Sequence, residues 1–146
     1  MPKRKPVRIR AAGRSDIARL GILIRTVIRE CRWMNRDERT ENSLRYGHAD
    51  LVKMCARNCL IVACDGARIV GFACIEEDGG PLYIRWVGVD HDYRRRGIAV
   101  RLLKAVHGRL GPRTQKIYFD TSVRNPAMTG AAAKAGFRVD GIQWSA

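Results

Sequence analysis

The spacing of apolar and polar residues predicts a chain in which strands and helices alternate. Between residues 7 and 12 apolar and basic residues alternate, which is the period of a strand, whereas between 15 and 28 apolar residues recur every three or four positions, as on one face of a helix. The same two patterns continue to the end of the chain. They predict strands at 7–12, 60–64, 68–75, 82–89 and 116–122, and helices at 15–28, 49–57, 96–110 and 125–135.

Turn-forming residues separate these elements. Asp65-Gly66 is a hairpin signal between two strands, Gly111-Pro112 stops the third helix, and Gly136 caps the last one. We expect a further turn over 76–81. The segment 31–47 is polar and irregular, and we expect it to lie within a mobile helix–loop–helix.

The order of the predicted elements indicates an α/β (α+β) fold with a single mixed, mostly antiparallel sheet flanked by helices. A length of 146 residues supports one domain over 1–146, of which 1–6 form a basic tail. We find neither internal repeats nor low-complexity segments.

A basic loop with a glycine joins the strand at 82–89 to the helix at 96–110. Several backbone N–H groups meet at such a junction, at the positive end of the helix dipole, and Gly97 has no Cβ to hold an anion away from them. The pattern is typical of a phosphate site. The loop and the first turn of the helix read Arg94-Arg95-Arg96-Gly97-Ile98-Ala99.

Residues 89–99 resemble the acetyl-CoA-binding motif of the GNAT N-acetyltransferases, Arg/Gln-x-x-Gly-x-Gly/Ala after a strand that ends in Val. Downstream, Asn125 followed eleven residues later by Gly136-Phe137 is similar to the second signature of that family. The resemblance implies the GNAT acyl-CoA N-acyltransferase fold and acetyl-CoA as a co-substrate. That family usually closes its sheet with two strands, but only nine residues follow Phe137. We therefore expect the final strand to be missing, which leaves an edge that is open or completed by a partner chain in a homodimer.

The resemblance also implies which residues bind acetyl-CoA. The pantetheine arm is expected to bond to the strand that ends at Val89, where the backbone N–H of Val87 polarises the thioester oxygen. Gly88, within that strand, indicates a bulge or a close approach. The expected binding residues are Val87, Val89, Arg94, Arg95, Arg96, Gly97, Ile98, Ala99, Asn125 and Lys134, of which Lys134 (with Arg101) is a candidate for the 3′-phosphate.

The catalytic groups depart from the family pattern. The strand at 82–89 lacks the carboxylate that many relatives carry there. Asp120, five residues before Asn125, stands where ribosomal-protein N-terminal acetyltransferases of the family place a Glu, so the resemblance implies that Asp120 serves as the general base or anchors the amine. Glu76 and Glu77 are second choices. At the position of the family's usual tyrosine acid stands Ala132, so that Tyr93, Tyr118 or water substitutes, or the thiolate leaves unassisted.

Two functions fit these residues. The first is an acetyl-CoA-dependent N-acetyltransferase that moves an acetyl group to a primary amine, such as a protein N-terminus, a lysine or a small amine. The second is a non-catalytic acyl-CoA-binding or regulatory module, which Ala132 favours.

A net charge of +14 adds nucleic acid or the ribosome as a partner of the basic surface, although the basic residues are spread along the whole chain. The five cysteines have no metal-ligand spacing and are expected to act as small apolar residues. No apolar run approaches the ~20 residues of a membrane span, and the N-terminus does not resemble a secretory signal. We expect no membrane partner and a cytoplasmic protein.

Overall fold

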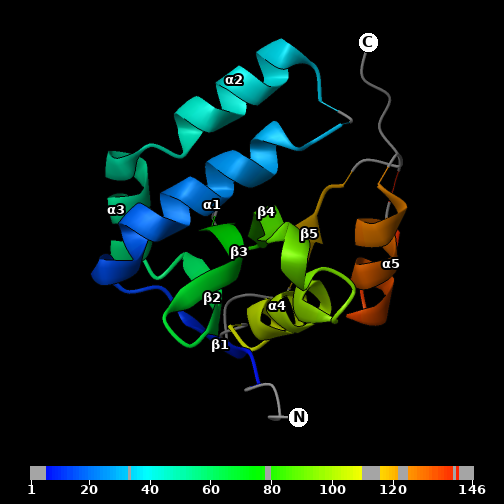
Figure 1. Ribbon diagram of the computed structural model, residues 1–146. Coiled ribbons are helices and arrows are strands. Elements are labelled where there is room, and N and C mark those ends of the chain that lie inside the picture. Colours follow the sequence, from blue (N-terminus) through cyan, green and yellow to red (C-terminus); the bar gives the residue numbers. More distant parts are fainter. Residues whose placement is uncertain are drawn as a thin grey trace.

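A five-stranded mixed sheet in the order β1-β2-β3-β4-β5 lies at the centre of the computed structural model, which describes residues 6–32, 34–77, 80–109, 116–121, 125–139 and 141 (Figure 1). The first four strands pair antiparallel, and β4 and β5 pair parallel. This confirms the predicted mixed, mostly antiparallel sheet. The strands are β1 (Arg8–Ala11), β2 (Leu60–Asp65), β3 (Arg68–Glu77), β4 (Leu82–Val89) and β5 (Ile117–Phe119).

Helices cover both faces of the sheet (Figure 1). On one face lie α1 (Ile17–Arg29), α2 (Arg36–Arg45) and α3 (His48–Ala56), and on the other lie α4 (Ile98–His107) and α5 (Pro126–Lys134). Successive residues of β2 enter different cores, because side chains alternate along a strand: Val62 packs with α1, whereas Ile61 packs with α4. Both faces of β2 and β3 are therefore buried.

The prediction of an irregular segment over 31–47 is wrong for 36–45, which form α2. Asn35 begins this helix: its side chain accepts the N–H of Glu38 at 2.8 Å and donates to the Glu38 carboxylate at 2.8 Å. No residue of α2 is buried, and Leu44 is 75 % exposed. The helix thus depends on its cap and has no apolar face that periodicity could detect.

The other boundaries differ by a few residues. Glu76 and Glu77, predicted in a turn, are the last residues of β3 and pair with Tyr83 and Leu82. β5 ends at Phe119, so the predicted strand over 116–122 is too long. The stop signal Gly111-Pro112 lies outside the described residues. Among residues 135–139 and 141, the described residues that follow α5, none belongs to a strand.

The described residues contain no group of His, Cys, Asp or Glu placed to hold a metal ion. All five cysteines are free, and burial raises the pKa of the Cys31 thiol to about 11 and that of Cys74 further. The Cys31 and Cys74 thiols therefore stay protonated at neutral pH. In the described part of the chain, no helix has the length and apolar character to cross a membrane.

Gly88 is a packing position near the C-terminal end of β4. A Cβ at Gly88 would lie 2.6 Å from the Phe72 ring and 2.9 Å from Val27 Cγ1. The close approach expected at this glycine is therefore made by two core side chains, one from β3 and one from α1.

We predict that Gly88→Ala lowers the free energy of unfolding by about 1–3 kcal/mol, because the added methyl overpacks the core beside Phe72. Gly130→Ala is the control: its Cβ meets no atom within 4 Å, and α5 gains about 0.5–1 kcal/mol of helix propensity. Urea unfolding of both variants measures the difference. A Gly88→Ala protein as stable as the parent would contradict this packing.

Candidate functional site

β4 separates from β5 halfway along its length. The two strands pair only at Leu82–Ile117, Tyr83–Tyr118 and Ile84–Phe119. At the next residue the register of β4 against β3 shifts, since Ile84 pairs with Ile75 but Trp86 pairs with Cys74. Arg85 is therefore the extra residue of a β-bulge, which bends the strand. Beyond it, β4 pairs with β3 alone among the described residues.

The bulge decides which backbone groups of β4 face the unpaired edge. The N–H of Asp90 donates to the Val70 carbonyl at 2.8 Å, so Asp90 and Gly88 point toward β3, and Val87 and Val89 point away from it. The N-terminal half of β4 is consistent with this assignment. There the Leu82 N–H donates to the Lys116 carbonyl on the β5 side at 3.0 Å, so even-numbered residues face β5 before the bulge and β3 after it. The N–H groups of Val87 and Val89 thus face the open edge.

The loop after β4 leads directly into the N-terminus of α4. Arg95 and Gly97 both have left-handed backbone conformations, with φ of 64° and 75°. The first helical bond is donated by Arg101 to the Gly97 carbonyl, so the N–H groups of Ile98 and Ala99 have no partner within the helix. Gly97 is the N-cap and supplies no side-chain cap. These donors, at the positive end of the helix dipole, suit an anion.

Contacts with the β2–β3 hairpin fix the shape of this loop. Asp90 accepts the N–H of Asp92 at 3.0 Å and pairs with Arg68 at 3.1 Å. The Tyr93 hydroxyl donates to Asp65, which raises the pKa of the phenol. Arg68 and Arg96 both lie over the Tyr93 ring, 5.2 and 4.8 Å from its centre. Tyr93 is therefore a support of the loop, with its proton already bonded, and it is a poor substitute for the missing acid.

The three arginines of the loop have different environments. Arg94 bridges two elements: its Nε donates to the Val89 carbonyl at 3.2 Å, and its Nη2 donates to Glu30 at the end of α1, also at 3.2 Å. Arg96 folds back on Tyr93 and the Asp92 carbonyl. Arg95 is exposed. In this arrangement the candidate anion site consists of backbone donors, with positive charge around it.

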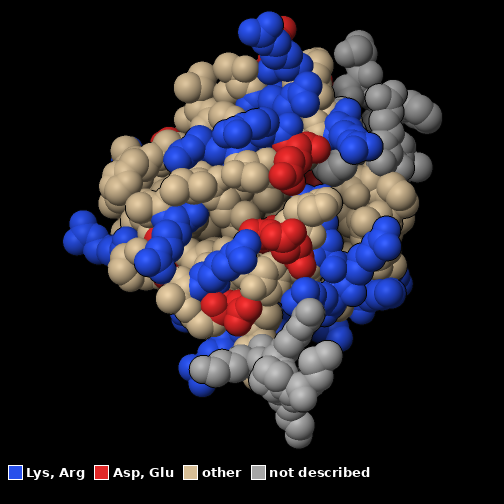
Figure 2. All heavy atoms as spheres, viewed as in Figure 1, with Lys and Arg blue, Asp and Glu red and all other residues tan. Residues whose placement is uncertain are grey.

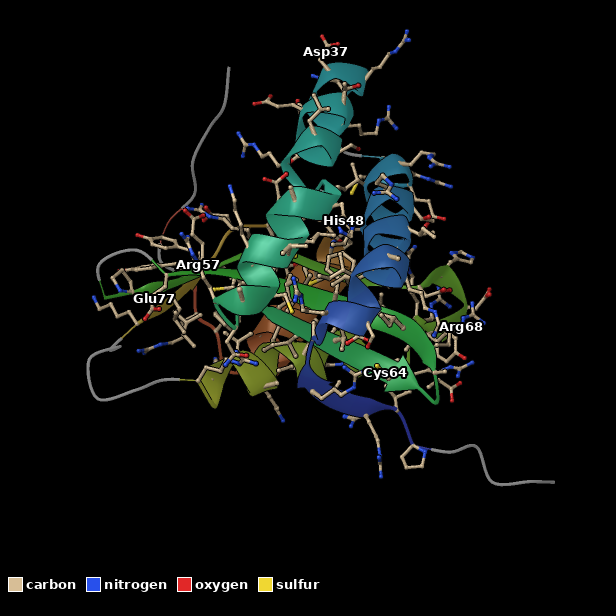
Figure 3. All side chains as sticks on the ribbon, turned by 90° about the vertical axis from the view of Figure 1, so that its left-hand side faces the viewer. Asp37, His48, Arg57, Cys64, Arg68 and Glu77 are labelled. Atoms are coloured by element: carbon tan, nitrogen blue, oxygen red, sulfur yellow. The ribbon has the colours of Figure 1, made fainter. Side chains whose placement is uncertain are left out.

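Asp120 is exposed and follows the last residue of β5, at the level where β4 departs. On the preceding residues, Tyr118 stacks on Tyr83 with ring centres 5.4 Å apart. Glu76 is held by Arg85 at 2.5 Å, so its carboxylate is occupied. Figure 3 shows Glu77 at the end of β3 opposite to Arg68. Of the candidate bases, Asp120 is the one that lies at the divergence of the strands without such an ion pair among the described residues.

α5 contributes its N-terminus and a buried alanine. The Asn125 side chain caps the helix by accepting the Met128 N–H at 3.2 Å. Ala132 is 9 % exposed and belongs to the core between the sheet and α4. Lys134 is exposed in the last turn of α5, about 14 Å along the helix from Asn125. It is not brought to the loop by any contact between described residues.

Sequence reasoning missed the residues that hold the loop: Glu30, Asp65 and Arg68. Each contacts the loop from another element, and Glu30 and Arg94 are 64 residues apart in the chain. Asp65 was recognised only as part of a turn. The hydroxyl–carboxylate and ion-pair contacts follow from the folded hairpin, so no local pattern could have revealed them.

Comparison with known proteins places this geometry in context. The family model described as the acetyltransferase (GNAT) family matches residues 28–137. No curated protein sequence matches the chain. Among solved structures, PaiA N-acetyltransferase from Thermoplasma acidophilum, in complex with coenzyme A, is similar with a TM-score of 0.84 and 13 % identity, over 95 % of this chain and 94 % of that one.

Two further structures share the fold. The aminoglycoside N-acetyltransferase AAC(6')-Iy in complex with CoA has a TM-score of 0.73 at 16 % identity, covering 100 % of this chain and 97 % of that one. A transcriptional regulator from Bacillus halodurans has a TM-score of 0.72 at 20 % identity, covering 97 % and 99 %.

We predict that Ala132→Tyr destabilises the protein by about 1–3 kcal/mol, because the ring must enter the core between α4 and the sheet. Ala133→Tyr, one residue along the same helix at an exposed position, should change the free energy of unfolding far less. Denaturant unfolding of the two variants measures the difference. Equal stability of both, with turnover maintained or raised in Ala132→Tyr, would show that position 132 faces open space beside the thioester.

Proposed function

The chain belongs to the GNAT acetyltransferase family, whose co-substrate is acetyl-CoA, and from this premise we propose that it transfers the acetyl group to a primary amine by direct attack in a ternary complex. The proposal rests on one observation: two sets of backbone N–H groups without partners in the sheet or the helix follow each other along the chain. The open edge of β4 at Val87 and Val89 runs into the uncapped N-terminus of α4. An extended chain that ends in a pyrophosphate matches both.

The fit of this ligand is supported by the space around Gly97. A Cβ at this residue would meet no protein atom within 4 Å, so the backbone is accessible from outside. We propose that the pyrophosphate accepts N–H groups from residues 97–99, with Arg94, Arg95 and Arg96 attracting it. Asn125 and Lys134 complete the proposed set, the latter toward the 3′-phosphate.

Along β4, the pantetheine arm takes the place that β5 would occupy if the strands stayed together. Its amides bond to Val87 and Val89. The Val89 carbonyl is now bonded by Arg94, so this guanidinium moves when the arm binds. The N–H of Val87 then lies at the thioester, where it stabilises the negative charge that develops on the carbonyl oxygen.

Acetyl transfer forms a C–N bond between the amine and the carbonyl carbon and breaks the C–S bond. The attacking amine must lose a proton, and we assign its removal to Asp120, directly or through one water. The sulfur leaves as a thiolate, which its pKa near 8.5 permits, and takes its proton from solvent. Tyr118, half-buried and stacked on Tyr83, is the remaining tyrosine candidate for the acid, since the Tyr93 hydroxyl is bonded to Asp65.

The proposed acceptor class rests on a resemblance at Asp120. Ribosomal-protein N-terminal acetyltransferases of the family place a Glu five residues before the Asn, which favours a protein or peptide N-terminus, with lysine side chains and small amines as the other candidates.

The second candidate, a non-catalytic acyl-CoA-binding module, is favoured by the burial of Ala132 and by a β4 without a carboxylate. Release of free CoA from acetyl-CoA after addition of peptide and amine libraries distinguishes the two. Amine-dependent release supports the transferase, whereas CoA binding without any release supports the binding module.

We predict that Gly97→Ala weakens CoA binding at least tenfold, because the methyl enters the space of the pyrophosphate and Ala is strained at φ 75°. Gly66→Ala is the matched control, since Gly66 has a φ of 59° and equally open space, but lies in the β2–β3 turn. Calorimetry should show lost affinity only in Gly97→Ala. Gly97→Val should abolish binding, and Arg94→Ala should weaken it mildly. Unchanged affinity in a folded Gly97→Val protein would remove the anion site.

We predict that Asp120→Asn lowers kcat about 10²-fold or more and leaves CoA affinity unchanged, because the amide keeps the size of the side chain but removes its basic oxygen. Glu76→Gln, a carboxylate already neutralised by Arg85, is the control and should retain kcat within a few-fold. Steady-state kinetics with a fixed amine compares them. If Asp120→Asn keeps kcat, another group accepts the proton.

A further inference from the structure

One face of α1 carries arginines that the acetyl-CoA site does not use. The buried side of this helix consists of apolar residues and Gly21, and its other side is turned to solvent. That side carries no acidic residue except Glu30, which is bonded to Arg94. The residues of this exposed side are Ala18, Arg19, Ile22, Arg25, Thr26, Arg29 and Glu30.

The three arginines of this face have free positive charge. None of the ion pairs between described residues includes Arg19, Arg25 or Arg29. They span roughly 15 Å along the helix axis, which is the length of a few phosphodiester units and more than a single small anion needs. Figure 2 shows basic side chains gathered over α1 on the viewed face. A linear polyanion fits this arrangement.

Beside the arginines, a shallow and open hollow of about 410 Å³ lies between α1 and the β2–β3 hairpin. Apolar side chains dominate its lining, and Ile22 is 61 % exposed there. Arg19 stands at its rim and donates to the Ala67 carbonyl at 2.8 Å. Arg68 also borders the hollow, but its charge is engaged by Asp90. The lining residues are Arg19, Ile22, Ala67, Arg68 and Ile69.

We propose that the exposed face of α1 binds single-stranded nucleic acid, with phosphates on Arg25 and Arg29 and one base in the hollow against Ile22. An apolar surface beside a guanidinium suits the face of a base, and only an unpaired strand has a base free to turn out. The hollow includes no residue of the pyrophosphate loop at 94–99. This binding is therefore a second activity, separate from acetyl transfer.

Fluorescence anisotropy with a labelled twelve-nucleotide oligothymidine, measured over a series of salt concentrations, tests the proposal. The two phosphate contacts at Arg25 and Arg29 give a slope of log K against log salt of about −1.4. The triple variant Arg19→Gln, Arg25→Gln and Arg29→Gln should weaken binding more than tenfold and lose most of that slope, while glutamine preserves the helix. The control, Arg8→Gln, Arg57→Gln and Arg138→Gln, removes equal charge from exposed positions elsewhere and should change affinity less than threefold.

Three further measurements test where the base binds and whether the acetyl-CoA site takes part in the binding. Ile22→Ser should weaken binding of oligothymidine several-fold without changing the salt slope, and should leave binding of an abasic strand of equal length unchanged. Saturating CoA should not displace the oligonucleotide. The proposal is overturned if the control triple variant loses as much affinity as the α1 variant, if CoA competes, or if a duplex of the same length binds as tightly as the single strand. Each of these results is independent of whether acetyl transfer occurs.

Discussion

The bulge at Arg85 is the feature on which the proposed site depends. Before it, β4 is an interior strand between β3 and β5, and its backbone groups are satisfied on both sides. After it, β4 no longer pairs with β5. The extra residue also shifts the alternation of the backbone by one, so that even-numbered residues, which face β5 before the bulge, face β3 after it. Without that shift, Gly88 would face the open edge and Val87 would be bonded to β3. The bulge thus creates an edge and selects the residues that present donors along it.

An unpaired strand edge in the middle of a sheet destabilises the fold unless a ligand or another part of the chain covers it. A buried N–H group without a hydrogen-bond partner loses its hydration without compensation, which lowers the free energy of unfolding. Here Arg94 bonds the Val89 carbonyl and is itself held by Glu30. The Arg94 guanidinium therefore connects the loop to α1, whose apolar side forms part of the core on one face of the sheet.

The sequence predicted those parts of the structure that are determined locally. Strands and helices with a buried face agree with the structure, and so does the strand–loop–helix junction at Gly97, because its signal is contained in six consecutive residues. α2 was missed since it buries nothing. The bulge could not be predicted, because it is a property of the register between β3 and β4. The supports of the loop, such as Asp65 for Tyr93, come from residues far apart in the chain.

The central claim is that the β4 edge and the N-terminus of α4 form a single acyl-CoA site, and the backbone amides report on it directly. NMR amide spectra and hydrogen exchange during titration with CoA measure each N–H separately. The account predicts an alternating response: the amides of Val87, Val89 and Ile98 shift and gain protection, while Gly88, whose amide faces β3, does not change. A response confined to the loop, or an equal response at Gly88 and its two neighbours, would contradict it.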